Sequence, residues 1–231
     1  MQNCAKNVLV ALGCMLGLAA CSAPPSDNSD FSARSAEESA VLFTGVVARV
    51  EPVAEQYCRD TTQRLNCDFE ILVLDDASAP ANAFQTLNRA GRPQIVFTLA
   101  LIADARNGDE LAFVLGHEAA HHIAGHLPQT RSNARAGGLI LGGLIGLSGG
   151  DPASVELALQ LGAELGARAY SKDFELQADR LGTIIAARAG YDPVRGAAFF
   201  SRIPDPGDRF LGTHPPNAER QQVVRETAAG L

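Results

Sequence analysis

Four of the five histidines lie in one short stretch, LGHEAAHHIAGHLP, which covers residues 115–128. They form two pairs, His117 with His121 and His122 with His126. On a helix, residues four apart lie on one face, about 6 Å apart along the axis, so either pair has the spacing of two metal ligands. The histidines therefore predict a metal site, and the neighbouring residues must decide which pair forms it.

The residue that follows the first histidine of each pair separates the two possibilities. Glu118 follows His117, about 100° further round the helix, where a carboxylate can act as a general base beside a metal. An isoleucine follows His122, and it can take part in no proton transfer. We therefore predict an HExxH zinc motif in which His117 and His121 bind the metal and Glu118 is the base. His122 and His126 should point away from the metal and serve packing or hydrogen bonding.

A catalytic zinc site needs a third protein ligand. The metzincin arrangement HExxHxxGxxH is excluded, because Ala124 and Leu127 occupy the positions of its glycine and third histidine. The remaining candidate is a carboxylate on another helix, and SKDFELQADRLG offers two that lie one turn apart. Glu175 could bind zinc directly, and Asp179 could hydrogen-bond a ligand histidine. Like charges one turn apart repel each other unless a cation lies near them, which favours this interpretation over a solvated acidic face.

A set of motifs in a fixed order makes the chain similar to a known family: DELAFVLGHEAAHHIAGH, FELQADRLG, GYDP and THPPNAER. With them the chain resembles the HtpX-like zinc metallopeptidases of metallopeptidase family 48, which also contains the CAAX prenyl proteases and the Oma-type enzymes. It looks like the soluble, lipid-anchored branch. The resemblance implies one zinc ion per chain, bound by His117, His121 and Glu175. It also implies that Glu118 is the catalytic base and that Asp179 supports the site.

The same resemblance implies a zincin domain of the gluzincin type and a zinc metalloendopeptidase. The expected substrate is unfolded or extended polypeptide, such as misassembled cell-envelope protein in protein quality control. Gluzincins bind substrate as a strand added to a sheet edge, for which the segment QIVFTLALI is the candidate. The alternative is a zinc-binding chaperone or assembly lipoprotein without turnover, although binding alone would not need Glu118. A structural lipoprotein without metal is a third possibility.

Three further residues are candidates for contact with the reacting groups. His214, in the segment GTHPP, is the only histidine outside the predicted active-site helix. A THP-type motif recurs in the family near the active site, so His214 could close the resting metal site or donate a hydrogen bond to the oxyanion in catalysis. It could equally be a loop histidine without a role. Tyr170 and Arg220 are weaker candidates for contact with substrate or oxyanion.

The N-terminus has the pattern of a bacterial lipoprotein signal. Residues 1–20 contain one lysine and an apolar run that is too short to span a membrane. The sequence LAAC then resembles a lipobox, after which Cys21 would carry the lipid and the polar residues 21–34 would form a tether. Residues 35–231 would form a single metallopeptidase domain. Ser22, in place of aspartate, indicates an outer-membrane lipoprotein that faces the periplasm; an ordinary cleaved signal is the alternative.

The cysteines and the charge restrict the compartment and the partners. After export, Cys58 and Cys67 would lie in an oxidising compartment, where a disulfide between them persists. The net charge is −7, and the arginines are scattered singly. This balance argues against nucleic acid, because binding it needs a basic face. The expected partners are therefore a polypeptide substrate and, through the lipid anchor, a membrane.

The first part of the domain should supply one helix and a small sheet. A capping box at Ser35 opens a helix, in which Pro52 should cause an interruption. Residues 68–76 are rich in aliphatic side chains and predict a strand. Residues 77–93 are loop-like, and the apolar residues 94–102 should begin as a second strand. Together with the helices that follow, these elements predict a mainly helical α+β fold with a small sheet.

The histidines lie in the next helix, which should start at Asn107 and stop at Pro128. Asp151 followed by proline opens a long helical pattern that ends near Gly190. Between them, GGLILGGLIGLSGG (residues 137–150) has glycine at every fourth position but is too short to span a membrane. It should pack over the active-site helices or form a mobile cover; a flexible linker or an interfacial membrane contact are the alternatives.

Overall fold

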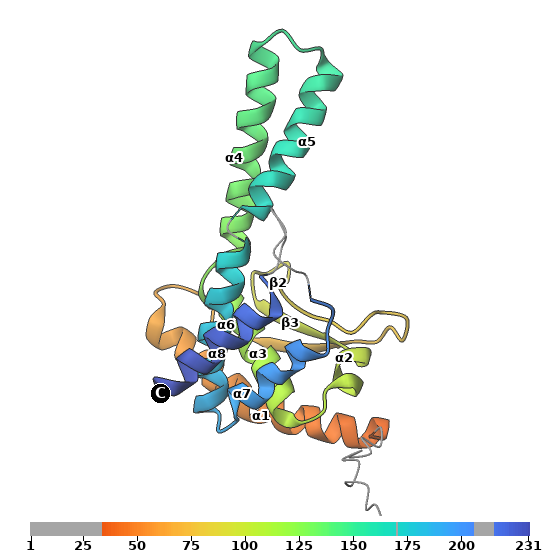
Figure 1. Ribbon diagram of the computed structural model, residues 1–231, viewed down its shortest axis with the longest axis vertical. Coiled ribbons are helices and arrows are strands. Elements are labelled where there is room, and N and C mark those ends of the chain that lie inside the picture. The colour runs from red at the N-terminus through yellow and green to blue at the C-terminus, as the bar shows by residue number, and fades with distance from the viewer. Residues whose placement is uncertain (1–33, 170, 206–214) are drawn as a thin grey trace, which may run out of the picture. The chain divides into compact units, whose positions relative to one another are not determined.

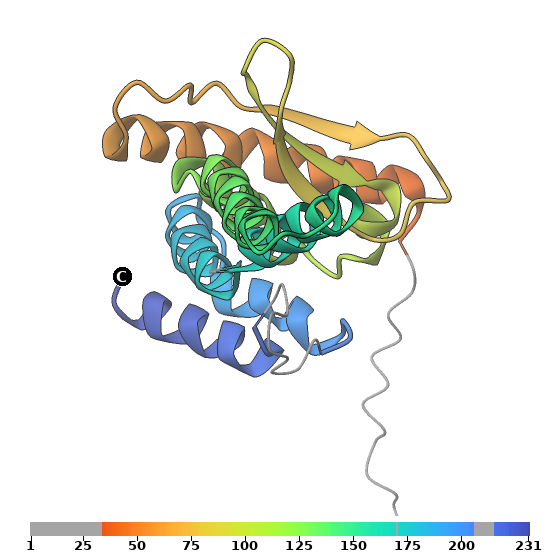
Figure 2. The same cartoon turned by 90° about the horizontal axis from the view of Figure 1, so that it is seen from above.

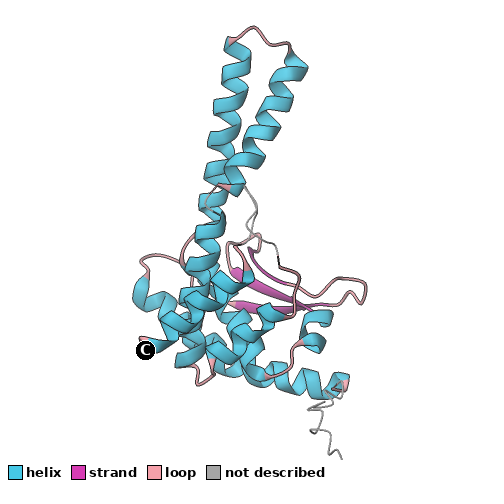
Figure 3. Ribbon diagram, viewed as in Figure 1, coloured by secondary structure: helices cyan, strands magenta, loops and turns pink. Residues whose placement is uncertain are grey.

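The computed structural model describes residues 34–169, 171–205 and 215–231, which belong to one compact unit that begins at Ala33. Its elements follow one another as Figures 1 and 3 show. They are α1 (Ala36–Thr61), β1 (Glu70–Leu74), β2 (Ala83–Leu87), β3 (Pro93–Thr98), α2 (Leu99–Asp104), α3 (Gly108–Ile123), α4 (His126–Leu147), α5 (Pro152–Arg168), α6 (Ser171–Arg188), α7 (Pro193–Gly196), the 3₁₀ helix η1 (Ala197–Ser201) and α8 (Asn217–Ala229). The predicted signal peptide and all of the predicted tether except Arg34 lie outside the described residues.

The sheet has three strands in the order β1-β3-β2, with β3 parallel to β1 and antiparallel to β2. The predicted mainly helical α+β fold with a small sheet is therefore confirmed. The apolar residues 94–102 divide between β3 and α2, because the side chain of Thr98 caps α2 by accepting the N–H of Leu101. Since β3 is the central strand and pairs on both sides, its prediction as the substrate-binding edge is wrong.

β2 lies within residues 77–93, where a loop was expected. Its sequence, AFQTL, is short, Phe84 is exposed and the other side chains are partly buried, so no clear alternation of apolar and polar residues marks it as a strand. Its pairing with β3 defines it instead. β2 is consequently an edge of the sheet, and such an edge presents backbone N–H and C=O groups that have no partner within the sheet.

α1 contributes one wall of the hydrophobic core, and Phe43 packs on Phe97 of β3 with 5.0 Å between ring centroids (Figure 2). The predicted interruption at Pro52 is wrong, since the helix is continuous to Thr61. Pro52 is exposed, and the buried face continues on both sides of it, so packing of this face outweighs the loss of one backbone hydrogen bond. The apolar residues that form the buried face are Phe43, Val46, Val50, Ala54 and Cys58.

α3 starts where the sequence predicted, with Asn107 as its N-cap. It ends at Ile123 and not at Pro128, because Gly125 adopts a left-handed conformation with a φ of 68°. Pro128 lies in the first turn of α4, where a missing N–H leaves no helical hydrogen bond unmade. His126 therefore belongs to a different helix from the other three histidines of the motif.

α4 and α5 form a long helical hairpin (Figures 1 and 3). At Gly137 and Gly162 the backbones approach so closely that a Cβ on either residue would collide with the carbonyl oxygen of the other. Residues 137–150 thus pack against α5, and the expectation that they cover the active-site helices is wrong. The helical pattern expected from Asp151 to Gly190 is divided between α5 and α6. Within the described part of the chain, none of the helices combines the length and the apolar character needed to cross a membrane.

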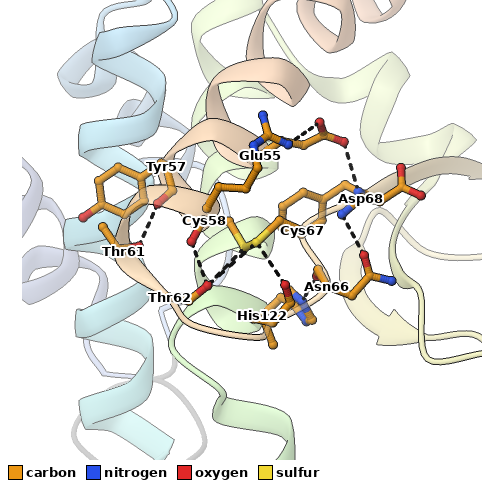
Figure 4. Close-up of a disulfide and its surroundings, with 12 residues drawn as sticks. Glu55, Tyr57, Cys58, Thr61, Thr62, Asn66, Cys67, Asp68 and His122 are labelled. Atoms are coloured by element: carbon orange, nitrogen blue, oxygen red, sulfur yellow. Dashed lines mark hydrogen bonds and ion pairs between the residues drawn. A yellow bond between two sulfur atoms is a disulfide. The ribbon is translucent and has the colours of Figure 1, made fainter.

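A disulfide between Cys58 and Cys67 joins the last turn of α1 to the segment that leads into β1 (Figure 4). Thr62 Oγ1 donates to the carbonyl oxygen of Cys58 at 2.7 Å. His122 Nε2 donates to the carbonyl oxygen of Asn66, also at 2.7 Å. The loop that the disulfide closes is therefore attached to α3 directly after the HExxH motif.

Replacing both Cys58 and Cys67 by serine should lower the free energy of unfolding by about 2–3 kcal/mol, because the disulfide restricts the unfolded chain. Urea denaturation of the variant and of the wild type measures this difference. Wild-type protein treated with a reductant is the control and should show a similar loss. Urea midpoints that stay the same in both cases would contradict the prediction.

Candidate metal centre and active site

Two helices in close contact carry the candidate site: α3 provides the HExxH motif, and α6 provides Glu175 and Asp179. Where they meet, a Cβ on Gly116 would lie 2.9 Å from the carbonyl oxygen of Gly182. A Cβ on Gly182 would lie 2.8 Å from the backbone nitrogen of His117. Glycine at both positions lets the two backbones approach and so brings His117 within reach of the α6 carboxylates.

The three predicted metal ligands lie together. The Nε2 atoms of His117 and His121 are 3.0 Å apart. Glu175 places Oε2 3.6 Å from His117 Nε2 and Oε1 3.4 Å from His121 Nε2. Among the described residues, these three form a group whose ligand atoms could hold a metal ion. Ligands about 2.0–2.2 Å from a tetrahedral zinc ion are roughly 3.3 Å from one another, so the separations and the donor types both fit zinc.

Asp179 is buried behind His117 and accepts the Nδ1–H of this ring at 2.9 Å, which leaves Nε2 as the ligand atom. Arg220 of α8 donates to both oxygens of Asp179, from Nε at 2.8 Å and from Nη2 at 2.7 Å. Burial alone would raise the pKa of Asp179, but the hydrogen bonds from Arg220 and His117 hold it below its usual value. Arg220 therefore acts on a ligand histidine through Asp179.

Glu118 lies beside His117 on the part of α3 that packs against β2. Its carboxylate lies near the backbone N–H of Gln85, in the edge strand. Burial raises the pKa of Glu118 to about 7, although the nearby N–H favours the charged form and by itself lowers the pKa. A general base transfers protons most effectively when its pKa lies near the working pH. A pKa of about 7 therefore suits the role of general base that the sequence predicted for Glu118.

The sequence predicted that His126 points away from the site, but the structure places its ring against His121. His126 Nε2 donates to Gln177 Oε1 at 3.1 Å, and its Nδ1 lies 2.9 Å from Nδ1 of His121. Burial lowers the pKa of His126, so its ring is neutral. Its Nδ1 carries no proton and accepts a hydrogen bond from the Nδ1–H of His121. The proton on His121 is thereby assigned to Nδ1, and Nε2 is left for the metal. The prediction failed because the chain turns at Gly125, and Phe174 of α6 stacks on the displaced ring.

Replacing His126 by alanine should weaken zinc binding about 10- to 100-fold, because the orientation of His121 is no longer fixed. Competition with a chromophoric zinc chelator measures the affinity. His122→Ala is the matched control, since His122 lies on the other side of α3 and contacts Asn66 and Phe69. The assigned role of His126 is refuted if both variants bind zinc as the wild type does.

Two cavities meet at the site, with volumes of about 520 and 500 Å³. Glu118, His121 and Glu175 line both of them. The edge strand contributes Ala83 to the first cavity and Phe84 to the second. The site is therefore open on two sides, along the strand that faces it.

Two candidates cannot be placed. Tyr170 and His214 both lie outside the described residues, so their proposed contacts with substrate, metal or oxyanion stay predictions. Arg220 lines the larger cavity, as a residue in contact with substrate would, but its guanidinium is bound to Asp179. The structure thus gives Arg220 a partner that sequence reasoning did not foresee.

Residues 46–228, which make up most of the chain, match the sequence profile of peptidase family M48. The chain belongs to peptidase family M48. The resemblance to this family of metallopeptidases, inferred from the order of the motifs, is thereby confirmed.

One relative of this M48 chain is the mitochondrial metalloendopeptidase OMA1 of Saccharomyces cerevisiae. The two are 27% identical over 165 residues, which cover 66% of this chain and 45% of the relative. The chain thus spans less than half the length of that protein. The name of the relative describes a metalloendopeptidase.

Sequence reasoning missed the roles of two residues that support the M48 site, Arg220 and His126, although the sequence contains a signal for each. Glu175 and Asp179 bring two negative charges to one helix face, and a buried pair of this kind calls for a protein cation, which Arg220 supplies. A glycine within a helical pattern often marks the end of a helix. Gly125 ends α3 in this way and so separates His126 from the other three histidines of the motif.

Proposed function

We propose that this M48 protein is a zinc-dependent endopeptidase that cleaves unfolded or misassembled proteins of the bacterial cell envelope. The observation that carries the proposal is the convergence of His117, His121 and Glu175 at the junction of two cavities, with Glu118 beside them. A factor that only bound its partners would need the metal ligands but no carboxylate base at this junction.

Each residue of the site has a distinct task in this reaction. When bound, zinc would supply Lewis acidity, which lowers the pKa of water and polarises the peptide carbonyl. Glu118 is placed to take a proton from the attacking water and to return it to the leaving amine nitrogen. Its pKa of about 7, raised by burial, suits both transfers. Asp179 orients His117 and His126 orients His121, so that both Nε2 atoms point to one place.

The proposed substrate is an extended polypeptide. β2 is an edge strand, and Ala83, Phe84 and Gln85 line the cavities on the two sides of the site. A substrate strand added to this edge would run through both cavities and place peptide on both sides of the bond that is cut. Only an unfolded segment can add to a sheet in this way, and cleavage would occur within the chain.

The proposed location rests on the N-terminal sequence. A signal peptide that ends before Cys21 would leave a lipid on this cysteine, and residues 21–34 would tether the domain to the outer membrane, facing the periplasm. The disulfide between Cys58 and Cys67 supports an oxidising compartment of this kind. Mass spectrometry of the N-terminus of membrane-purified protein tests the anchor; a free thiol on Cys21 would argue against it.

Cleavage of casein, an unfolded protein, tests the proposed activity. Zinc-loaded protein should cut casein at internal bonds, which mass spectrometry of the products identifies, and should leave a stably folded protein intact. Chelation should stop cleavage, and added zinc should restore it. Casein binding without cleavage would identify a zinc-binding chaperone or assembly factor. Release of single residues from the ends would identify an exopeptidase.

A further inference from the structure

Apart from the residues of the metal site, the first cavity has mainly apolar walls. Val114 lines it from α3, one turn before His117, and Leu101 lines it from α2. The rings of Phe113 and Phe200 meet edge to face in its wall, with 5.6 Å between their centroids. The other large apolar side chains of the wall are Phe199 and Ile203. With a volume of about 520 Å³, this cavity has room for one large side chain of a substrate.

The charges around the first cavity disfavour an acidic side chain. Of the described residues that line it, only Arg220 is a lysine or an arginine, and its Nε and Nη2 donate to Asp179. Asp104, which is exposed, adds a negative charge. A substrate carboxylate in this cavity would therefore lose water and find no free cation away from the metal, which is strongly unfavourable. An apolar side chain would instead bind favourably, because its surface leaves water.

The part of the wall that follows η1 is anchored to α3 by a buried ion pair. Arg202, which directly precedes Ile203, donates to both oxygens of Glu110, at 2.6 and 2.8 Å. Glu110 is buried, and the Arg202 guanidinium also lies 5.3 Å from the ring centroid of Phe199. Paired charged hydrogen bonds of this kind fix geometry as well as adding energy. The positions of Phe199 and Ile203 are therefore set by the fold, and the cavity is formed before a substrate binds.

The hydrogen bonds of β2 determine which of its backbone groups are free. Asn82 accepts the N–H of Thr98. Because hydrogen-bonded residues alternate along an antiparallel ladder, Phe84 also bonds to β3. The N–H and C=O groups of Ala83 and Gln85 therefore point to the free edge. Since Ala83 lines the first cavity and Gln85 the second, a strand bound to these groups passes from one cavity to the other.

The direction of β2 then sets the direction of the substrate. In an antiparallel ladder one residue exchanges two hydrogen bonds with the residue opposite it, and such ladders are slightly more stable per residue than parallel ones. This arrangement suits an edge that offers Ala83 and Gln85 within a strand of five residues. β2 runs from the first cavity toward the second, so an antiparallel substrate runs from the second cavity to the first. The residue that follows the cut bond then lies at the first cavity.

We propose that the first cavity binds the side chain of the residue that follows the cut bond and selects a large apolar side chain there. Val114 and Ile203 determine the size that is accepted, because both line the cavity and are only partly buried. The inference rests on the proposed peptidase function and adds a preference to it. Large apolar residues are mostly buried in folded proteins, so this preference directs cleavage to unfolded chains.

The first residue of each C-terminal casein product, identified by mass spectrometry, tests the preference. Phenylalanine and leucine should occur there at least about ten times more often than aspartate and glutamate, relative to their frequency in casein. Val114→Phe narrows the cavity and should lower cleavage before phenylalanine at least about tenfold relative to cleavage before alanine. Ile203→Phe narrows it from the other wall and should act in the same way. Leu127→Ala is the matched control, since Leu127 lines only the second cavity, and it should leave this ratio unchanged.

Probes that need no turnover separate this inference from the proposed function. A succinyl hydroxamate binds zinc through its hydroxamate and places its first side chain where the residue after the cut bond would lie. Isothermal titration calorimetry with zinc-loaded wild type should show at least about tenfold tighter binding of a benzyl than of a methyl side chain, and the weakest binding for carboxymethyl. This order without casein cleavage would refute the endopeptidase function and support the preference of the cavity.

Three results would overturn the inference. The first is an apolar preference at the residue before the cut bond, which would reverse the direction of the substrate. The second is equal binding of the three hydroxamates. The third is a folded Val114→Phe or Ile203→Phe variant, verified by circular dichroism and zinc content, that keeps the wild-type ratio of cleavage before phenylalanine and alanine.

Discussion

Replacing Glu118 by glutamine should reduce casein cleavage by about 10²- to 10⁴-fold, the usual contribution of a general base, while zinc binding stays unchanged. Glutamine has the shape of glutamate and can occupy the same space, but its amide cannot take a proton from water. The carboxylate is not one of the three grouped metal ligands. Initial rates of casein cleavage and zinc per chain, measured on the same preparations, check both parts of the prediction.

Glu156→Gln provides the matched control, because Glu156 is an exposed glutamate on α5. It should cleave casein at the wild-type rate. Activity of Glu118→Gln within a few-fold of wild type would show that another group takes the proton. Loss of zinc from Glu118→Gln would show that the carboxylate holds the metal, and the assignment of Glu175 as third ligand would then need revision.

Replacing Arg220 by methionine should destabilise the protein by about 3–5 kcal/mol, because it leaves the buried carboxylate of Asp179 without its cation. Methionine retains much of the apolar stem of arginine, which packs on the ring of Phe200. The loss should therefore come mainly from the charge. Urea denaturation measures the free energy of unfolding, and chelator competition should show weaker zinc binding, since Asp179 also orients His117.

A second substitution separates charge from packing. Asp179→Asn added to Arg220→Met removes the buried charge, so the double variant should be more stable than Arg220→Met alone. Arg225→Met, on the exposed side of the same helix, is the control and should change stability little. The account fails if Arg220→Met unfolds at the wild-type urea concentration, or if adding Asp179→Asn makes the protein still less stable.

The sequence predicted the chemistry of the site better than its surroundings. Spacing on a helix and one following carboxylate were enough to separate His117 and His121 from His122, because α3 is regular up to Ile123. Glu175 was selected as the remaining carboxylate on another helix, and the repulsion between two like charges one turn apart favoured a cation near it. These arguments concern positions within one helix, where backbone geometry determines which side chains meet.

The errors arose where contacts between elements decide the structure. Pro52 did not end α1, because packing on both sides of it outweighs its local preference. β2 was missed because its pairing with β3 defines it more than its own residues do. His126 was placed on the wrong face because one glycine, Gly125, redirects the chain. The partner of Asp179 lies on α8, far along the chain, and helical spacing says nothing about it.

The position of zinc in crystals of the wild-type protein tests the central claim most directly. Anomalous scattering at the zinc absorption edge should show one strong peak per chain, about 2.0–2.2 Å from Nε2 of His117, Nε2 of His121 and an oxygen of Glu175. A main peak at His122, or no peak between these three residues in crystals grown with zinc, would contradict the account.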